Sequence, residues 1–91
     1  MPVGVLFEIP GGTQQQYDGI MRDMHLGGKL PPGALYHVAG PTARGWRVVD
    51  VWESEAAFEK FAREQIMPLA QKHGVPPFDP QVFPVHNILK P

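Results

Sequence analysis

The sequence predicts an α+β domain whose elements follow the order strand, helix, strand, strand, helix, strand. Apolar runs of strand length alternate with two segments in which apolar residues recur at helical spacing. Proline and glycine are abundant, at 11 and 10 of 91 residues, and they cluster as turn residues between these segments. We expect residues 1–91 to form one domain. The order is that of the ferredoxin-like fold, whose four-stranded antiparallel sheet has the first and third strands in its centre.

The first half of the chain is predicted to hold a strand, a helix and a second strand. Residues 3–9 are apolar and bounded by turn residues, which is typical of a strand. Thr13 is suited to cap a helix that ends by Gly27. The apolar residues of this helix are Tyr17, Ile20, Met21 and Met24. Residues 34–39 are predicted as a short strand, followed by a hairpin.

The second half is predicted to hold two strands on either side of a helix. Residues 46–52 are rich in valine and tryptophan, and Ser54 is suited to cap the helix that follows. The buried stripe of this helix is predicted to be Phe58, Phe61, Ala62, Ile66, Leu69 and Ala70. Pro68 lacks a backbone N–H, so we expect a kink or a restart near Met67, and Gly74 ends the helix. Residues 81–89 are the predicted fourth strand.

The strands predict a sheet that is apolar on both faces. In residues 46–52, Trp46, Val48 and Trp52 point one way, whereas Val49 and Val51 point the other. Helices cover only one face of such a sheet, and an exposed apolar face favours association. We therefore expect a homodimer through the open sheet face. Pro84, inside the fourth strand, indicates an edge position.

Composition excludes several classes of function. The formal net charge is −1, from 8 basic and 9 acidic residues, so no basic surface is expected to bind nucleic acid. Residues 44–51 partly resemble the third-strand motif of RNA-recognition domains, but the second and third aromatic residues are missing. The absence of cysteine excludes disulfides and thiolate chemistry. No apolar stretch has membrane-spanning length and no basic leader begins the chain, so we expect no membrane partner and a cytoplasmic location.

Residues 45–74, GWRVVDVWESEAAFEKFAREQIMPLAQKHG, resemble the third strand and second helix of dimeric α/β-barrel proteins. The similarity is closest to the antibiotic-biosynthesis-monooxygenase-like branch, in which Val-Trp-Glu-Ser followed by Ala-Phe is a familiar junction. PVHNIL near the C-terminus is similar to small members of the same superfamily. The resemblance implies a face-to-face dimer with a pocket in each subunit between sheet and helices. It also implies a choice among cofactor-free oxygenases, lactone isomerases, dehydratases, haem-degrading enzymes and proteins without known activity.

The residues typical of the haem-degrading branch are missing from this sequence. That branch carries an asparagine on the first strand and a tryptophan and a histidine on the second helix. The comparable places here hold Glu8, Phe61 and Gln71. We therefore expect no haem cleavage and no cofactor.

Asp50 is the first candidate for chemistry, because an acid in a central strand is costly to bury without a partner. His37 and His86 could supply that partner from the edge strands, and Tyr17 or Arg22 could supply it from the first helix. On the functional interpretation, Asp50 orients His37 or His86 as a general base. On the alternative interpretation, Asp50 forms a buried pair that only stabilises the fold.

The aromatic residues Tyr17, Trp46 and Trp52 are candidates for lining a ligand site, although in a small domain such residues also serve as core. None of the four histidines has the spacing of a helical metal site, so no metal is expected. Together these features predict an enzyme that is oxygenase-like or isomerase-like and acts on a small hydrophobic or aromatic molecule by acid–base chemistry. The alternative is a dimeric ligand-binding or accessory protein without catalysis.

Overall fold

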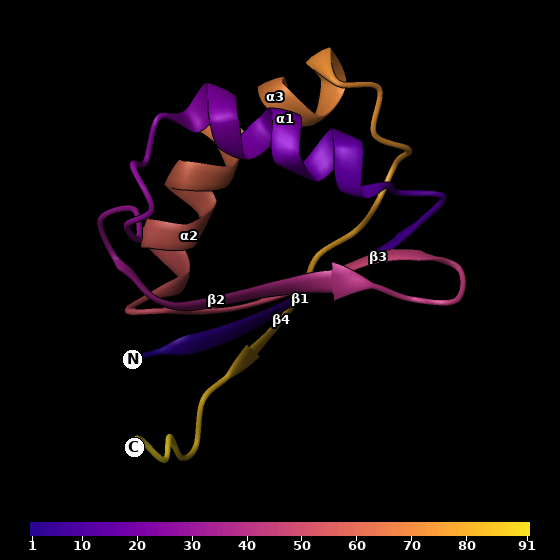
Figure 1. Ribbon diagram of the computed structural model, residues 1–91. Helices are drawn as coiled ribbons and strands as arrows, with labels where there is room; N and C mark the ends of the chain where they lie inside the picture. The colour runs from indigo at the N-terminus through magenta and orange to yellow at the C-terminus, as the bar shows by residue number, and fades with distance from the viewer.

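The computed structural model describes residues 1–91 and confirms the predicted fold class. The elements are β1 (Val3–Pro10), α1 (Gln14–Met24), β2 (Ala34–Pro41), β3 (Gly45–Trp52), α2 (Glu55–Phe61), a π-helical turn η1 (Ala62–Ile66), α3 (Met67–Lys72) and β4 (Gln81–Pro84). The strands form one antiparallel sheet in the order β2-β3-β1-β4, with β1 and β3 central. All helices lie over one face of the sheet, and no helix covers the other face (Figure 1).

Helix α1 begins where the sequence predicts. The Thr13 hydroxyl accepts a hydrogen bond from the Gln16 backbone N–H, and the Gln16 side chain accepts one from the Thr13 N–H. This capping box satisfies two of the backbone donors that a helix start leaves free. The helix ends at His25, whose left-handed conformation has φ of 56°. The predicted end, by Gly27, is therefore confirmed.

The predicted interruption at Pro68 is present as well. Helix α2 starts after Ser54, whose hydroxyl accepts a hydrogen bond from the Ala57 N–H. It then passes through the wider turn η1 before α3 restarts at Met67, which places Pro68 in the first turn of α3. The wider turn accommodates the proline: the Met67 N–H donates to the Ala62 carbonyl five residues back, and Pro68 has no N–H that would need a partner. Gly74, with φ of 70°, follows the end of α3.

The predicted fourth strand is too long. The sequence predicts a strand over residues 81–89, but β4 ends at Pro84. Pro84 pairs with Val3, the first residue of β1, so the neighbouring strand offers no further ladder. Beyond this point the Val85 N–H donates to the Pro2 carbonyl at 3.0 Å, and the chain then leaves the sheet. The edge position inferred from Pro84 is confirmed.

The core lies between the sheet and the helices. Its buried members are Val3, Val5, Phe7, Trp46, Val48, Trp52 and Phe58. The rings of Phe7 and Phe58 pack edge to face at 5.8 Å, and Trp52 is 1% exposed. These residues come mainly from one side of β1 and β3, which the structure shows to be the helix-facing side, and they keep the alternation that the sequence predicts.

The opposite face of the sheet is apolar and exposed. Val38, Val49 and Leu6 lie side by side on β2, β3 and β1. Val38 is 63% exposed and Phe83, on β4, is 50% exposed. We call this surface the open face and define it by Leu6, Tyr36, Val38, Val49, Val51 and Phe83. No helix of the chain is both long and apolar enough to span a bilayer.

An ion-pair cluster joins α1 to α3 on the outer side of the helical layer. The Asp23 carboxylate accepts hydrogen bonds from Lys72 Nζ and from His73 Nε2, both at 2.8 Å. The His73 ring also packs against Gly19, where an added Cβ would lie 2.6 Å from the ring. This cluster holds α1 over the sheet.

We predict that this cluster makes stability depend on pH at the acid end. The hydrogen bonds from Lys72 and then His73 lower the pKa of Asp23 from 3.8 to about 2. Because the folded pKa lies below the unfolded one, the stabilisation is complete above about pH 4 and is lost as the pH falls through about 2. NMR titration of the Asp23 carboxyl should show this midpoint, and Asp23→Asn should remove the corresponding part of the acid unfolding curve. A midpoint near 3.8 would contradict the prediction.

Candidate functional site

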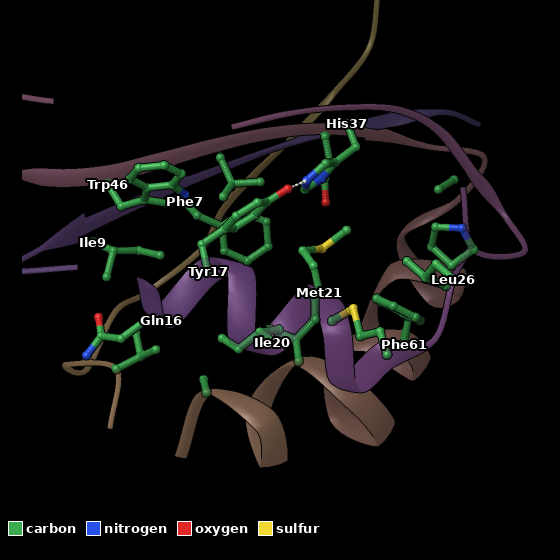
Figure 2. A pocket seen from close by; sticks show the side chains of 18 of the residues that line it. Phe7, Ile9, Gln16, Tyr17, Ile20, Met21, Leu26, His37, Trp46 and Phe61 are labelled. Atoms are coloured by element: carbon green, nitrogen blue, oxygen red, sulfur yellow. Dashed lines mark hydrogen bonds and ion pairs between the residues drawn. The ribbon is translucent and has the colours of Figure 1, made fainter. Parts of the chain in front are cut away.

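A cavity of about 300 Å³ lies between the sheet and helix α1. Its wall has 25 residues, of which 17 are hydrophobic, so a bound molecule would meet mostly apolar surface. This volume is at the lower end of the range typical of small-molecule sites. Ile20 and Met21 of α1 approach the cavity from the helical side, and Trp46 and Phe7 approach it from the sheet (Figure 2).

Three polar side chains form a hydrogen-bonded chain on this wall. The Tyr17 hydroxyl lies 2.5 Å from Nε2 of His37 (Figure 2), and Nδ1 of His37 lies 2.6 Å from Oδ1 of Asp50. The other carboxylate oxygen, Oδ2, accepts a hydrogen bond from Trp52 Nε1 at 3.2 Å. Each member of the chain therefore has a partner, and the chain ends at the cavity with Tyr17.

Strand register and helix docking bring these residues together. His37 on β2 is directly opposite Asp50 on β3, so their side chains share the helix-facing side of the sheet. An irregularity between Ala34 and Tyr36 in β2 shifts the register before His37 is reached. Tyr17 comes from the face of α1 that packs on the sheet.

Asp50 is the one charged residue among the buried residues of the chain, at 5% exposure. Burial of a carboxylate without partners is costly, but hydrogen bonds to both oxygens offset that cost. A carboxylate only accepts hydrogen bonds, so Nδ1 of His37 is the donor in this pair. Nε2 is then the acceptor for the Tyr17 hydroxyl.

The environment keeps the Tyr17 phenol protonated. Burial first, and then the negative charges of Asp50 and Asp18, raise the pKa of Tyr17 above its ordinary value of 10.0. At neutral pH the Tyr17 hydroxyl is therefore a hydrogen-bond donor. This agrees with the direction of the chain derived from Asp50 and His37.

Aromatic rings surround the polar chain. The Tyr17 and His37 rings are nearly parallel, at 7° with centroids 5.8 Å apart, and Tyr17 lies 5.3 Å from Trp46. On the other side, Trp52 contacts Phe61 at 5.3 Å. The indole N–H of Trp46 is buried and has no hydrogen-bond partner. The cavity wall therefore combines flat apolar surfaces with very few polar groups.

The structure brings most of the sequence-predicted site residues together. Tyr17, His37, Asp50, Trp46 and Trp52 all line the cavity. His86 does not, because it is exposed and follows the end of β4. Its predicted place on an edge strand depended on a strand that continued to residue 89, and β4 is shorter than that. Arg22, which the sequence also offers as a partner of Asp50, is exposed on α1 and does not line the cavity.

The sequence alone does not identify the loop residues of the cavity wall. Leu26, Leu30 and Pro31 line the cavity from the segment between α1 and β2, and Phe78 lines it from the segment before β4. Nothing in the periodicity of the helices and strands identifies such residues, since they lie outside both. No group of three or more histidine or acidic residues is placed to hold a metal ion.

Comparison with known proteins relates the fold to one group of structures. No protein-family model and no curated protein sequence matches this chain. Among solved structures, a protein assigned as an antibiotic biosynthesis monooxygenase from Chloroflexus aurantiacus aligns with a TM-score of 0.64 at 14% identity over 97% of both chains. SnoaB, a cofactor-independent oxygenase from Streptomyces nogalater, aligns with a TM-score of 0.63 at 16% identity over 97% of this chain and 95% of its own.

A third structure, of a protein assigned the same way from Deinococcus radiodurans, aligns with a TM-score of 0.64 at 8% identity over 99% of this chain and 97% of its own. The chain therefore has the fold of antibiotic-biosynthesis-monooxygenase-like proteins along its whole length. The resemblance of residues 45–74 points to the same branch. At sequence identities of 8–16%, the similarity shows a shared fold only.

Proposed function

We propose that this protein is an enzyme that binds a small hydrophobic or aromatic molecule in the cavity and removes a proton from it. The observation that carries the proposal is the His37–Asp50 pair, at 2.6 Å, on the wall of an otherwise apolar cavity. A histidine held by a carboxylate is oriented for proton transfer, and a low-polarity site strengthens its interaction with a developing anion. The flat rings of Trp46 and Trp52 suit a planar ligand.

Loss of a proton from a hydroxyl group or an activated C–H of such a molecule leaves a delocalised anion. The anion can be reprotonated at another atom, which is an isomerisation, or it can give electrons to dioxygen, which is a cofactor-free oxygenation. The similarity in fold to SnoaB, a cofactor-independent oxygenase, favours the second outcome. In both cases the chain supplies binding and the proton acceptor.

The proposal is tested by a ligand screen with planar hydroxylated aromatics and quinones, read by thermal shift and followed by oxygen uptake for each ligand that binds. A ligand at ten times its Kd stabilises the fold by about 1.4 kcal/mol. For a domain of this size that is a rise in Tm of about 6–11 °C. Met21→Trp fills the cavity and should abolish the rise in Tm. The matched control is His86→Gln, at an exposed residue outside the cavity, which should keep the rise. Absence of binding by every compound would remove the basis of the proposal.

The second candidate function is ligand binding without catalysis. It is favoured if ligands bind, if none is altered, and if Asp50→Asn changes only stability. The buried Asp50 carboxylate with both oxygens paired is the observation that keeps this candidate open, because such a pair also stabilises a fold.

We also propose that two copies of the chain associate through the open face. Val38 and Phe83 expose large apolar area there, and Glu8 and Arg47 form an ion pair on the same side of the sheet. Association of two copies about a twofold axis buries the same surface on both, as a self-complementary apolar face requires. The helical layer and the cavity remain free on the outside of such a dimer.

We predict that Val49→Asp disrupts this dimer, because it would place two unpaired charges in an apolar interface. Sedimentation velocity at micromolar concentration should show a dimer for the parent chain and a monomer for the variant. Met67→Asp, at an exposed apolar residue of α3, is the matched control and should remain dimeric. A parent chain that sediments as a stable monomer would rule out the interface.

A further inference from the structure

We propose that the Tyr17 hydroxyl, and not the His37 imidazole, is the group that touches the substrate and takes its proton. His37 then receives the proton of Tyr17, and Asp50 holds the resulting imidazolium. This inference rests on the proposed function of the cavity and assigns the roles within it. The three side chains would act as a tyrosine–histidine–aspartate relay with Tyr17 as the catalytic residue and the other two behind it.

The first argument is that His37 has no free ring nitrogen. Nδ1 is 2.6 Å from Asp50 and Nε2 is 2.5 Å from the Tyr17 hydroxyl. A substrate atom could reach Nε2 only by displacing Tyr17. That displacement would break a hydrogen bond and would move a ring that packs on Trp46 at 5.3 Å.

The second argument is that the Tyr17 oxygen keeps the capacity to accept. A phenol donates one hydrogen bond and retains lone pairs for another partner. Its one proton is directed to His37, so its accepting side is available to a molecule in the cavity that it lines. Tyr17 is therefore placed to receive a proton from the substrate as it passes its own proton on.

The third argument is that the other polar side chains of the wall are engaged or cannot accept. The Thr13 hydroxyl already accepts from the Gln16 N–H, and the Lys29 ammonium has only donors. Both oxygens of Asp50 are hydrogen-bonded. The Gln16 side chain accepts from Thr13 N–H and donates to the Gly74 carbonyl, so it is occupied at both ends. The unpartnered Trp46 Nε1 is a donor, which can bind a substrate oxygen but cannot take a proton.

The proton movements balance without another reactant. The substrate O–H or C–H bond breaks and its proton bonds to the Tyr17 oxygen. The Tyr17 O–H bond breaks and that proton bonds to Nε2 of His37. The substrate is left as an anion, Tyr17 is again a neutral phenol that can donate to that anion, and the imidazolium is paired with the Asp50 carboxylate. No electrons are exchanged in this step.

The test uses 4-nitrophenol, whose ionised form absorbs visible light and whose neutral form does not. We expect the bound phenol to be ionised in the parent chain well below the pH at which free 4-nitrophenol ionises. In Tyr17→Phe the phenol should still bind, but its ionised fraction at the same pH should fall at least tenfold. The control is Tyr36→Phe, at the other tyrosine of the chain, which lies on the open face and should behave as the parent.

Two further variants separate a relay from a structural role. In His37→Gln the amide oxygen can still accept from Tyr17 but cannot take its proton, so the bound phenol should stay neutral. Asp50→Asn should shift the pH of half-ionisation upward because the imidazolium loses its carboxylate. If Tyr17→Phe does not fold, Tyr17→Met fills the same place with a flexible apolar side chain and replaces it in the comparison.

The outcomes are distinct. Ionisation of the phenol in Tyr17→Phe with the same pH of half-ionisation as in the parent chain would overturn the inference, since the Tyr17 hydroxyl would then contribute nothing to the proton transfer. The proposed function would survive that result. Failure of 4-nitrophenol and every other planar compound to bind the parent chain would instead remove the proposed function and the relay with it. Binding without ionisation in the parent chain would also overturn the relay.

Discussion

Replacement of Asp50 by asparagine is expected to slow proton transfer in the cavity by about 10²- to 10⁴-fold, the usual contribution of an acid–base group such as the one that Asp50 positions. The same change should lower the free energy of unfolding by about 1–3 kcal/mol, the cost of leaving one buried donor unsatisfied. Both effects have one cause. The carboxylate accepts from His37 Nδ1 and from Trp52 Nε1, whereas an amide can accept from only one of them and presents its own N–H groups to the other.

The measurement is the turnover rate on a ligand found in the screen, together with chemical denaturation of the same preparation. Asp79→Asn is the matched control, because it makes the same substitution at an exposed residue and should change neither quantity. A loss of stability with an unchanged rate would show that Asp50 is structural only. Retention of both would contradict the hydrogen-bonded chain itself.

The second large effect is expected from Gly45→Ala, which should destabilise the fold by about 3 kcal/mol or more, at the upper end of the cost of overpacking. A Cβ at Gly45 would lie 2.2 Å from the Ile9 carbonyl oxygen and 2.7 Å from the Gly11 nitrogen. Both are backbone atoms, so no side chain can rotate away to relieve the contact. The start of β3 and the turn after β1 would have to separate, and Trp46 would move with them.

Thermal unfolding should show a Tm lower by about 12–24 °C in Gly45→Ala, the shift that this loss of stability produces in a domain of this size. Gly40→Ala is the control, since it makes the same change in β2, where the added Cβ would meet no residue beyond its chain neighbours within 4 Å. If the two variants unfolded at the same temperature, the close approach of β1 and β3 at this corner would be wrong. The fluorescence of Trp46 and Trp52 gives a second measure of the displacement.

Much of the fold was predictable because its signals are local. The order of the elements, the capping of α1 by Thr13 and the interruption at Pro68 all follow from residues within a few positions of one another. The alternation in residues 46–52 also predicted that Asp50 shares a face with both tryptophans, and the structure shows that this face is the helix-facing one. The predicted length of β4 was wrong because an edge strand ends where its partner strand ends. β1 begins at Val3, which pairs with Pro84, so the residues after Pro84 have no strand to pair with.

The site depended on distances that no local pattern contains. The sequence by itself determined that Asp50 needs a hydrogen-bonding partner, because it places an acid in a central strand where burial of an unpaired carboxylate is costly. It left four candidates, because His37, His86, Tyr17 and Arg22 lie far from Asp50 along the chain. Tertiary structure decided among them: the register of β2 on β3 sets His37 opposite Asp50, the docking of α1 sets Tyr17 on His37, and the early end of β4 carries His86 away. Register and docking are set by the packing of whole elements, so they become visible only when the chain is folded.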